Sequence, residues 1–418
     1  MPAQAQADND GFSLEEIIVT AKKREATLQE TPIAVSAVTA EALAIAGTRD
    51  IYDTQFLVPS LQVVQRASAT NTNFAIRGIA SSTFNFGIEP AVGVFVDGVY
   101  RSRNGASISD FLGVERIEIL RGPQSTLFGK NTTAGVINYI TIAPHYDLEV
   151  EAEITYGNLD ARIAKVGVNI PITEDRLAIR LDANVNKRDG FVENIDGRIL
   201  NERDRYGLRG QLLFEPTDTA SFRLIVDYNN IDEECCAAPF FDIVPATLGV
   251  LGILGSQIAG VEIKDQVTFV SGDVISQLTT KGISGHWDVE SDDFALTSIT
   301  AYRKYDEFQD FDADFTDLPL NKSRQETKGY STFTQEIRLT STGDNTIDWM
   351  VGAYYLDQDL DITASTLQGP LLRGFGDALS GGAISGIEAA LGLPFGTFLA
   401  EDSGLIAGTF DQTNQTYA

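Results

Sequence analysis

The sequence predicts an α+β domain followed by a large antiparallel β-sheet of the transmembrane β-barrel type. Residues 28–146 mix short strands, short helices and glycine-controlled turns, which is typical of a compact α+β unit. From residue 147 onward the strands become longer and alternate between apolar and polar residues. The connections between these strands alternate between short and long, which favours an outer-membrane barrel.

The composition excludes one broad class of function. The chain has 418 residues, a net charge of −28 and a pI near 4.3, whereas nucleic-acid binding requires clustered lysine and arginine. We therefore expect no nucleic-acid partner. No stretch reaches the ~18 apolar residues of a membrane helix, which excludes helical spans but not membrane-spanning strands.

Residues 1–27 form a polar tail that contains one apolar patch, EEIIVTA over Glu15–Ala21. A short β-prone segment in a polar tail cannot bury itself, so it requires a partner strand. That partner is either a strand of the adjoining domain or a strand of another protein. Near the start, Ala3, Ala5 and Ala7 resemble the end of a signal-peptide cleavage site, so we expect a processed or shortened N-terminus.

The α+β unit begins with alternating short elements. The pattern predicts a strand over 32–38, helices over 40–46 and 50–57, strands over 61–65 and 73–79, and a hairpin over 92–100. Thr39 can cap the first helix and Gly47 can end it. Asp97 followed by Gly98 is a strong hairpin turn signal.

The most informative stretch is Glu115–Thr141, which reads ERIEILRGPQSTLFGKNTTAGVINYIT. It predicts a strand with Ile117 and Ile119 on one face, followed by a turn at Arg121–Pro123. Because proline suits the first turn of a helix, a short helix is expected over 124–128, and a second strand over 136–140.

Nine longer strands are expected after residue 147. They cover residues 148–156, 162–170, 176–187, 205–215, 221–230, 274–289, 294–305, 330–341 and 347–360. In the third, Leu177, Ile179 and Leu181 alternate with Arg180 and Asp182, which fits either a lipid-facing barrel wall or a soluble sandwich. The alternation of short and long links favours the barrel. Because a plugged transporter barrel has about 22 strands, we expect an incomplete barrel.

No catalytic or metal-binding motif is recognisable. The sequence lacks P-loop, HExxH, GxSxG, GxGxxG and CxxC patterns and has only two histidines, so we expect no enzyme, cofactor, catalytic residue or metal site. The acidic run Asp306–Asp317 fails as a calcium loop because Phe315 and Asn321 replace the required glycine and glutamate. A bond between the adjacent Cys235 and Cys236 would be strained. A locally constrained loop is therefore favoured over a redox or metal-binding pair.

The stretch over 115–141 resembles the plug domain of TonB-dependent outer-membrane receptors, whose hallmark is an LRGP turn followed by LFG and AGVIN-type segments. The NFAIRGI strand over 73–79 and the FVDGV hairpin over 95–99 match the same family in the same order. The resemblance implies a tail with a TonB box (1–27), a plug domain (28–146) and the N-terminal part of the barrel (147–418). The TonB box falls on Glu16, Ile17, Ile18, Val19, Thr20 and Ala21.

The resemblance implies TonB-dependent active uptake of a scarce ligand across the outer membrane of a Gram-negative bacterium, by a monomer embedded in lipid. TonB would be the periplasmic partner, adding a strand to the box. Ferric siderophores are the family's usual ligands, with plant or aromatic compounds and oligosaccharides as alternatives. Loops over 240–261 and 367–399, rich in Leu, Ile and Phe, favour an apolar or amphipathic ligand. A passive porin and a surface adhesion or docking protein are the alternative functions.

One wall residue is a candidate latch between plug and barrel. In FTQEIRLTS, Thr334, Glu336 and Arg338 share the polar side of the strand. A carboxylate inside a lumen that another domain fills requires a cation. The family's QEIRL strand carries a glutamate that contacts plug arginines, and the resemblance places it at Glu336. We expect Arg121, or else Arg77, as its partner; a residue that faces trapped water is the alternative.

Overall fold

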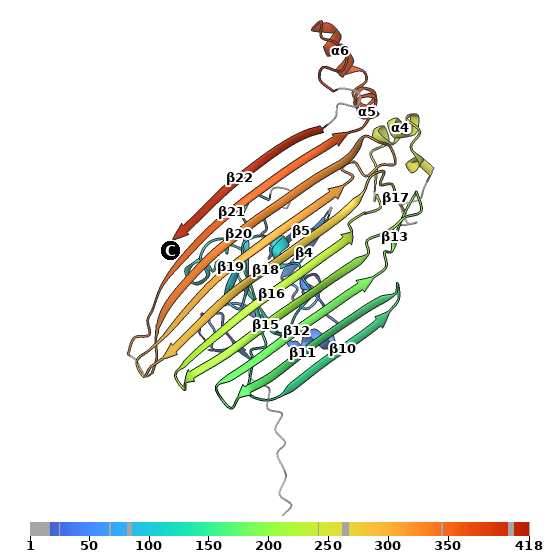
Figure 1. Ribbon diagram of the computed structural model, residues 1–418. Helices are drawn as coiled ribbons and strands as arrows, with labels where there is room; N and C mark the ends of the chain where they lie inside the picture. Colours follow the sequence, from blue (N-terminus) through green and yellow to red (C-terminus); the bar gives the residue numbers. More distant parts are fainter. Residues whose placement is uncertain are drawn as a thin grey trace, which may run out of the picture.

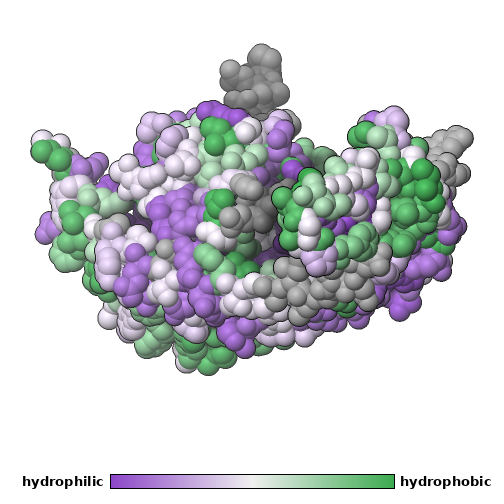
Figure 2. Space-filling view, turned by 90° about the horizontal axis from the view of Figure 1, so that it is seen from above, coloured by the Kyte–Doolittle hydropathy of each residue, from purple (hydrophilic) through white to green (hydrophobic). Residues whose placement is uncertain are grey.

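The protein consists of a curved ten-stranded sheet and a smaller α+β unit on its inner side (Figure 1). The structure is a computed structural model that describes residues 17–24, 26–66, 68–81, 86–240, 242–260, 267–343, 346–399 and 405–417. Seen from above, the molecule has a curved outer side and a hollowed, partly filled inner side (Figure 2).

The smaller unit, the plug, is built on a five-stranded mixed sheet. In sheet order the strands are β3 (Val35–Thr39), β8 (Val114–Arg121), β9 (Gly135–Thr141), β6 (Val92–Val96) and β7 (Val99–Arg101). The remaining elements are α1 (Ala40–Ile45), α2 (Ile51–Thr54), α3 (Ser125–Phe128), the turn η1 (Asn104–Ser107) and the hairpin of β4 (Leu61–Arg66) with β5 (Ser68–Ile76). Each expected plug element is present, with bounds that differ by a few residues.

Local signals explain where these elements begin and end. The Thr39 side chain accepts a hydrogen bond from the amide of Ala42 at 3.3 Å, which caps α1. The carboxylate of Asp50 caps α2 in the same way. Asp97 and Gly98 take φ values of 48° and 76°, as a tight hairpin turn between β6 and β7 requires.

The wall is an antiparallel meander in which each strand pairs with the next. Its strands are β10 (Glu149–Gly157), β11 (Ala161–Thr173), β12 (Leu177–Arg188), β15 (Arg203–Thr217), β16 (Ala220–Glu234), β18 (Val274–Glu290), β19 (Phe294–Phe311), β20 (Asn321–Ser341), β21 (Met350–Gln368) and β22 (Leu405–Tyr417). The nine expected strands are all present. The tenth strand, β22, was not predicted, because glycine, threonine and asparagine interrupt its alternation of apolar and polar residues. Only its pairing with β21 identifies it as a strand.

The long connections carry the outer elements. These are β13 (Val192–Asn194), β14 (Ile199–Leu200), β17 (Val267–Thr268), α4 (Pro245–Ile253), η2 (Gln257–Gly260), α5 (Leu372–Leu379) and α6 (Ala383–Ala390). Helices α4, α5 and α6 gather at one end of the wall, while the short turns lie at the other (Figure 1). We call these the long-loop end and the short-turn end.

The wall is inverted relative to a soluble sheet. On β12, Arg180, Asp182 and Asn184 are buried on the face toward the plug, whereas Leu181 and Val185 on the other face are 52% and 41% exposed. A soluble sandwich buries its apolar face, so that alternative is wrong. An exposed apolar face over a buried polar face is the pattern of a barrel wall in lipid.

The plug packs directly on the inner face of the wall. One hydrophobic cluster contains the plug residues Ile51, Phe74 and Ile117 together with Leu278 and Tyr305 of the wall. This contact confirms the predicted placement of the plug inside the barrel curve. In the described part of the chain, no helix has the length and apolar character needed to cross a membrane.

Candidate functional site

The tail folds back as a small hairpin beneath the plug. Strand β1 (Ile18–Val19) pairs antiparallel with β2 (Ala26–Thr27), in the register Ile18 with Thr27 and Val19 with Ala26. Val19 and Ala21 are fully buried, in a cluster with Phe95, Leu120 and Phe128. The predicted box segment from Ile17 to Ala21 is therefore docked on the plug, while Glu16 lies outside the described residues.

The buried carboxylate of Glu118 holds the second edge of this strand. Its Oε1 accepts hydrogen bonds from the amide of Thr20 at 2.8 Å and from Nε of Arg116 at 3.0 Å. Nδ2 of Asn138 donates to Oε2 at 3.3 Å. Glu118 points toward the tail because it alternates along β8 with Ile117 and Ile119, which face the core. With β2 on one edge and Glu118 on the other, the predicted box strand has few main-chain groups left to form hydrogen bonds with another strand.

Lys23, just after the box, joins the tail to the wall. Its Nζ lies 3.2 Å from Oε2 of Glu336 and 4.8 Å from the centre of the Phe128 ring. Burial lowers the pKa of Lys23, although Glu336 opposes that shift. Arg338 pairs with the other oxygen of Glu336. Glu336 therefore lies on the lumen side and binds a cation, as expected.

The predicted partners of Glu336 are wrong. Arg121 folds over β3, where its Nε and Nη2 donate to the carbonyl oxygens of Ala34 and Val35 at 3.3 and 3.2 Å. Arg77 is exposed in the turn after β5. The tail hairpin, which no sequence pattern placed there, supplies the cation instead.

The basic stretch Lys22–Arg24, after the predicted box, is anchored to the wall and is not a solvated linker. The Lys23 side chain is only 9% exposed, and Arg24 donates to the carbonyl oxygen of Trp349 on the wall at 2.7 Å. The sequence did contain one indication of this contact. Lys23 follows a strand that requires a partner, and the predicted lumen face of the wall carries acidic side chains.

The ion pairs between the body of the plug and the wall have the opposite polarity to the expected one. Nη1 of Arg205 on the wall lies 3.3 Å from a carboxylate oxygen of Asp50 on the plug. Nη2 of Arg223 likewise lies 3.7 Å from Asp97. Here the wall supplies the arginines and the plug the carboxylates.

A large cavity opens between the top of the plug and the wall. It measures about 830 Å³, within the range of sites for small organic ligands. Its lining comprises Asn71, Phe86, Gly87, Ile88, Gln309, Phe311, Ala313, Phe315, Arg324, Glu326, Lys328, Ile362, Ala364, Phe410 and Gln412. Nζ of Lys328 lies 5.1 Å from the centre of the Phe86 ring. The cavity thus combines aromatic faces with cationic groups, and we call it the outer cavity.

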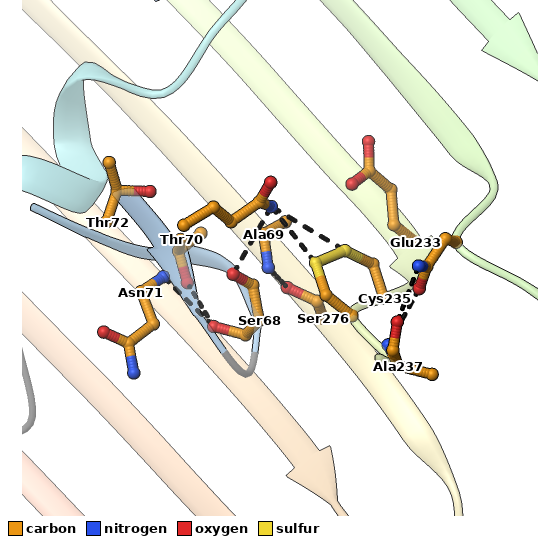
Figure 3. The surroundings of a disulfide bond; sticks show 12 residues. Ser68, Ala69, Thr70, Asn71, Thr72, Glu233, Cys235, Ala237 and Ser276 are labelled. Atoms are coloured by element: carbon orange, nitrogen blue, oxygen red, sulfur yellow. Dashed lines mark hydrogen bonds between the residues drawn. A yellow bond between two sulfur atoms is a disulfide. The ribbon is translucent and has the colours of Figure 1, made fainter. Parts of the chain in front are cut away.

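The two cysteines are joined by a disulfide at the outer end of β16 (Figure 3). Nε2 of Gln65, at the tip of the β4–β5 hairpin, donates to Sγ of Cys236 at 3.1 Å. Next to it, the amide of Ala69 donates to Oγ of Ser276 on β18 at 3.2 Å. These contacts tie the top of the plug to the wall.

The acidic run extends from β19 into the loop that follows it. Asp312 accepts from the amides of Ser271 and Asp314, and Asp314 accepts from the amides of Thr316 and Asn321. Burial, reinforced by the neighbouring Asp312, raises the pKa of Asp314 to about 6. Within the described ranges no three His, Cys, Asp or Glu residues gather as metal ligands would.

Comparison with known proteins agrees with this architecture. Residues 27–136 match the family model of the TonB-dependent receptor plug domain. The pesticin receptor of Yersinia pestis is 27% identical over 178 residues, which cover 42% of this chain and 26% of that receptor. The iron-regulated outer membrane virulence protein of Vibrio cholerae is 33% identical over 151 residues, covering 33% and 22%. These matches span about a quarter of each relative's length.

Solved structures show the same fold over more of the chain. The ferric yersiniabactin uptake receptor FyuA from Yersinia pestis aligns with a TM-score of 0.68 at 19% identity, over 80% of this chain and 50% of that one. The pyoverdine receptor FpvA from Pseudomonas aeruginosa aligns with a TM-score of 0.67 at 16% identity, over 84% and 50%. The chain thus has the fold of the plug and of part of the barrel of TonB-dependent receptors. The predicted resemblance to this family and the predicted fold are confirmed, and the description of the Vibrio cholerae relative agrees with the predicted outer-membrane location.

Proposed function

We propose that this chain belongs to a receptor that takes up a small ligand across the outer membrane, driven by TonB. The observation that supports this most directly is the docked box strand. Its main-chain pairing with β2 covers two residues on each strand, and one further main-chain hydrogen bond runs from the amide of Leu28 to the carbonyl oxygen of Ile17 at 2.9 Å. Side chains of the plug and the wall supply further anchors. A strand held in this way is bound to the plug but can be released to pair with a strand of another protein.

In this proposal the three parts of the chain have separate tasks. Residues 1–27 present the box to TonB, residues 28–146 close the lumen, and residues 147–418 form the wall that we have described. Strand addition by TonB would replace β2 along Val19 and withdraw Thr20 from Glu118. Pulling on the tail would then separate Lys23 from Glu336, so the force would reach the plug and the wall together.

The outer cavity is the proposed ligand site. The relatives include a pesticin receptor and receptors for catecholate siderophores, yersiniabactin and pyoverdine. Aromatic faces suit an aromatic iron chelate or another small organic compound. The cations Arg324 and Lys328 are both paired with Glu326, so an anionic group of the ligand would compete with that carboxylate for them. The described lining residues include no histidine or cysteine, so an iron ion would arrive as cargo, already coordinated by its chelator.

The experiment is an uptake assay with the full-length receptor and radiolabelled ferric siderophores. Val19→Pro removes a backbone donor of the box and should abolish energy-dependent uptake while ligand binding persists. Val19→Ala keeps that donor and is the matched control. Normal uptake by Val19→Pro would overturn the proposal. A passive porin would instead transport without a proton gradient, and an adhesion protein would not accumulate ligand.

A further inference from the structure

A second, smaller cavity lies between the plug and the wall, away from the outer cavity. Its volume is about 40 Å³, whereas a single water molecule needs roughly 10–15 Å³. Three arginines and two aspartates line it: Arg101 and Asp110 from the plug, and Arg209, Asp227 and Arg303 from the wall. Its lining therefore carries one more positive than negative charge.

Both aspartates already have cationic partners. Asp227 accepts two hydrogen bonds from Arg303, at 2.7 and 2.6 Å. Asp110 lies 3.7 Å from Arg205 and accepts from Nδ2 of Asn186 at 2.6 Å. Among the described residues, Arg101 and Arg209 form no ion pair within 4 Å, although the charges of Asp227 and Asp97 act on both guanidinium groups.

The unpaired polar atoms of this cavity are mostly donors. Nη1 of Arg101, Nε of Arg209, the Tyr139 hydroxyl and the Ser107 hydroxyl are buried without a hydrogen-bond partner among the described residues. Oδ1 of Asp110 is the single pure acceptor in the same position. Burial raises the pKa of Tyr139 well above its usual value, so the phenol keeps its proton and can donate.

Water alone fits this arrangement poorly. Each water that accepts from these donors adds two hydrogens of its own, and the cavity offers few acceptors for them. A small anion accepts from several donors and brings none. It also places a negative charge beside two buried guanidinium groups, which favours its binding. Arg101 is 6% exposed and Arg209 is 8% exposed, so bulk solvent provides little screening.

We propose that this cavity binds a monovalent halide ion, such as chloride, between Arg101 of the plug and Arg209 of the wall. The ion would accept hydrogen bonds from both the plug and the wall, so halide occupancy would strengthen the seating of the plug.

The test uses the purified full-length receptor and bromide as the probe. Crystals soaked in sodium bromide should show one anomalous peak between Arg101 and Arg209; its absence would overturn the proposal. In solution, chloride or bromide should raise the melting temperature relative to gluconate at equal ionic strength. Equal melting temperatures in the three salts would also overturn the proposal.

Variants assign the effect to the site. Arg101→Gln should remove the halide-dependent rise, whereas Arg121→Gln, which alters an arginine outside this cavity, should retain it. Tyr139→Phe removes one neutral donor with little change in shape. In this variant, the bromide concentration that gives half of the maximal rise in melting temperature should increase about fivefold, as the loss of one hydrogen bond predicts. This milder variant tests the site even if Arg101→Gln fails to fold, and an unchanged halide response in it would contradict the proposal.

Discussion

Nζ of Lys23 lies 3.2 Å from Oε2 of Glu336, and this ion pair connects the tail directly to the barrel wall. The lysine lies two residues beyond the box segment and is stacked over Phe128 of the plug. One side chain thus contacts the three parts of the protein that must separate if force on the tail is to move the plug.

The two partners of this pair should respond differently to mutation. Lys23→Met leaves Glu336 paired with Arg338 and keeps apolar contact with the rings, so tail docking should weaken by ~0–1 kcal/mol. Glu336→Gln leaves Lys23 and Arg338 without their carboxylate and should cost ~3 kcal/mol. A spin label on the tail should report more release for Glu336→Gln. Lys22→Met is the neighbouring control, and equal release by both test variants would refute this asymmetry.

Glu118 should control how tightly the box strand is stored. Glu118→Gln replaces a carboxylate that accepts from four donor groups by a neutral amide, which should cost ~1–3 kcal/mol. Hydrogen exchange at the Thr20 amide should accelerate by roughly ten- to a hundredfold. Glu115→Gln changes an exposed glutamate on the same strand and should leave that amide protected. Unchanged exchange in Glu118→Gln would show that the carboxylate does not hold the box.

Phe86 should contribute to ligand binding in the outer cavity. Its ring faces Lys328, and its centre lies 5.8 Å from that of Tyr305. Phe86→Ala removes aromatic surface from the cavity lining and should weaken binding of a ferric siderophore by roughly tenfold or more, measured by titration calorimetry. Phe56→Ala removes an 80% exposed ring elsewhere on the plug and is the control. Equal affinities in both variants would place the ligand elsewhere.

The loop after β19 should become less stable as the pH rises. The folded pKa of Asp314 is about 6, above the ~3.9 of an unfolded aspartate, so the folded loop holds its proton more tightly. This contribution is therefore fully present below pH ~3.9 and is lost as the pH rises toward 6. Hydrogen exchange at the Asn321 amide, corrected for its intrinsic rate, should show less protection at pH 7 than at pH 4.5. Asp314→Asn should remove that difference; a larger difference in the variant would contradict the assignment.

Local sequence determined most of the fold. The alternation in β12, the Asp97–Gly98 turn and the Thr39 cap are each decided by neighbouring residues, because they depend on side-chain period and backbone preference. The family-specific stretch over 115–141 placed the plug, and the alternation of short and long links distinguished the two ends of the wall. Strand β22 was not predicted because its alternation is weak, and its pairing with β21 is what defines it as a strand.

The tertiary structure decided which charges meet. Sequence alternation placed Glu336 on the lumen side, but its cation came from a tail hairpin more than three hundred residues away, not from Arg121 or Arg77. The same holds for the wall arginine Arg205 and the plug carboxylate of Asp50. Period and propensity act over a few residues, whereas a lumen contact depends on how two separately folded bodies are oriented. That orientation is set by packing across the whole interface, so no single stretch of sequence contains it.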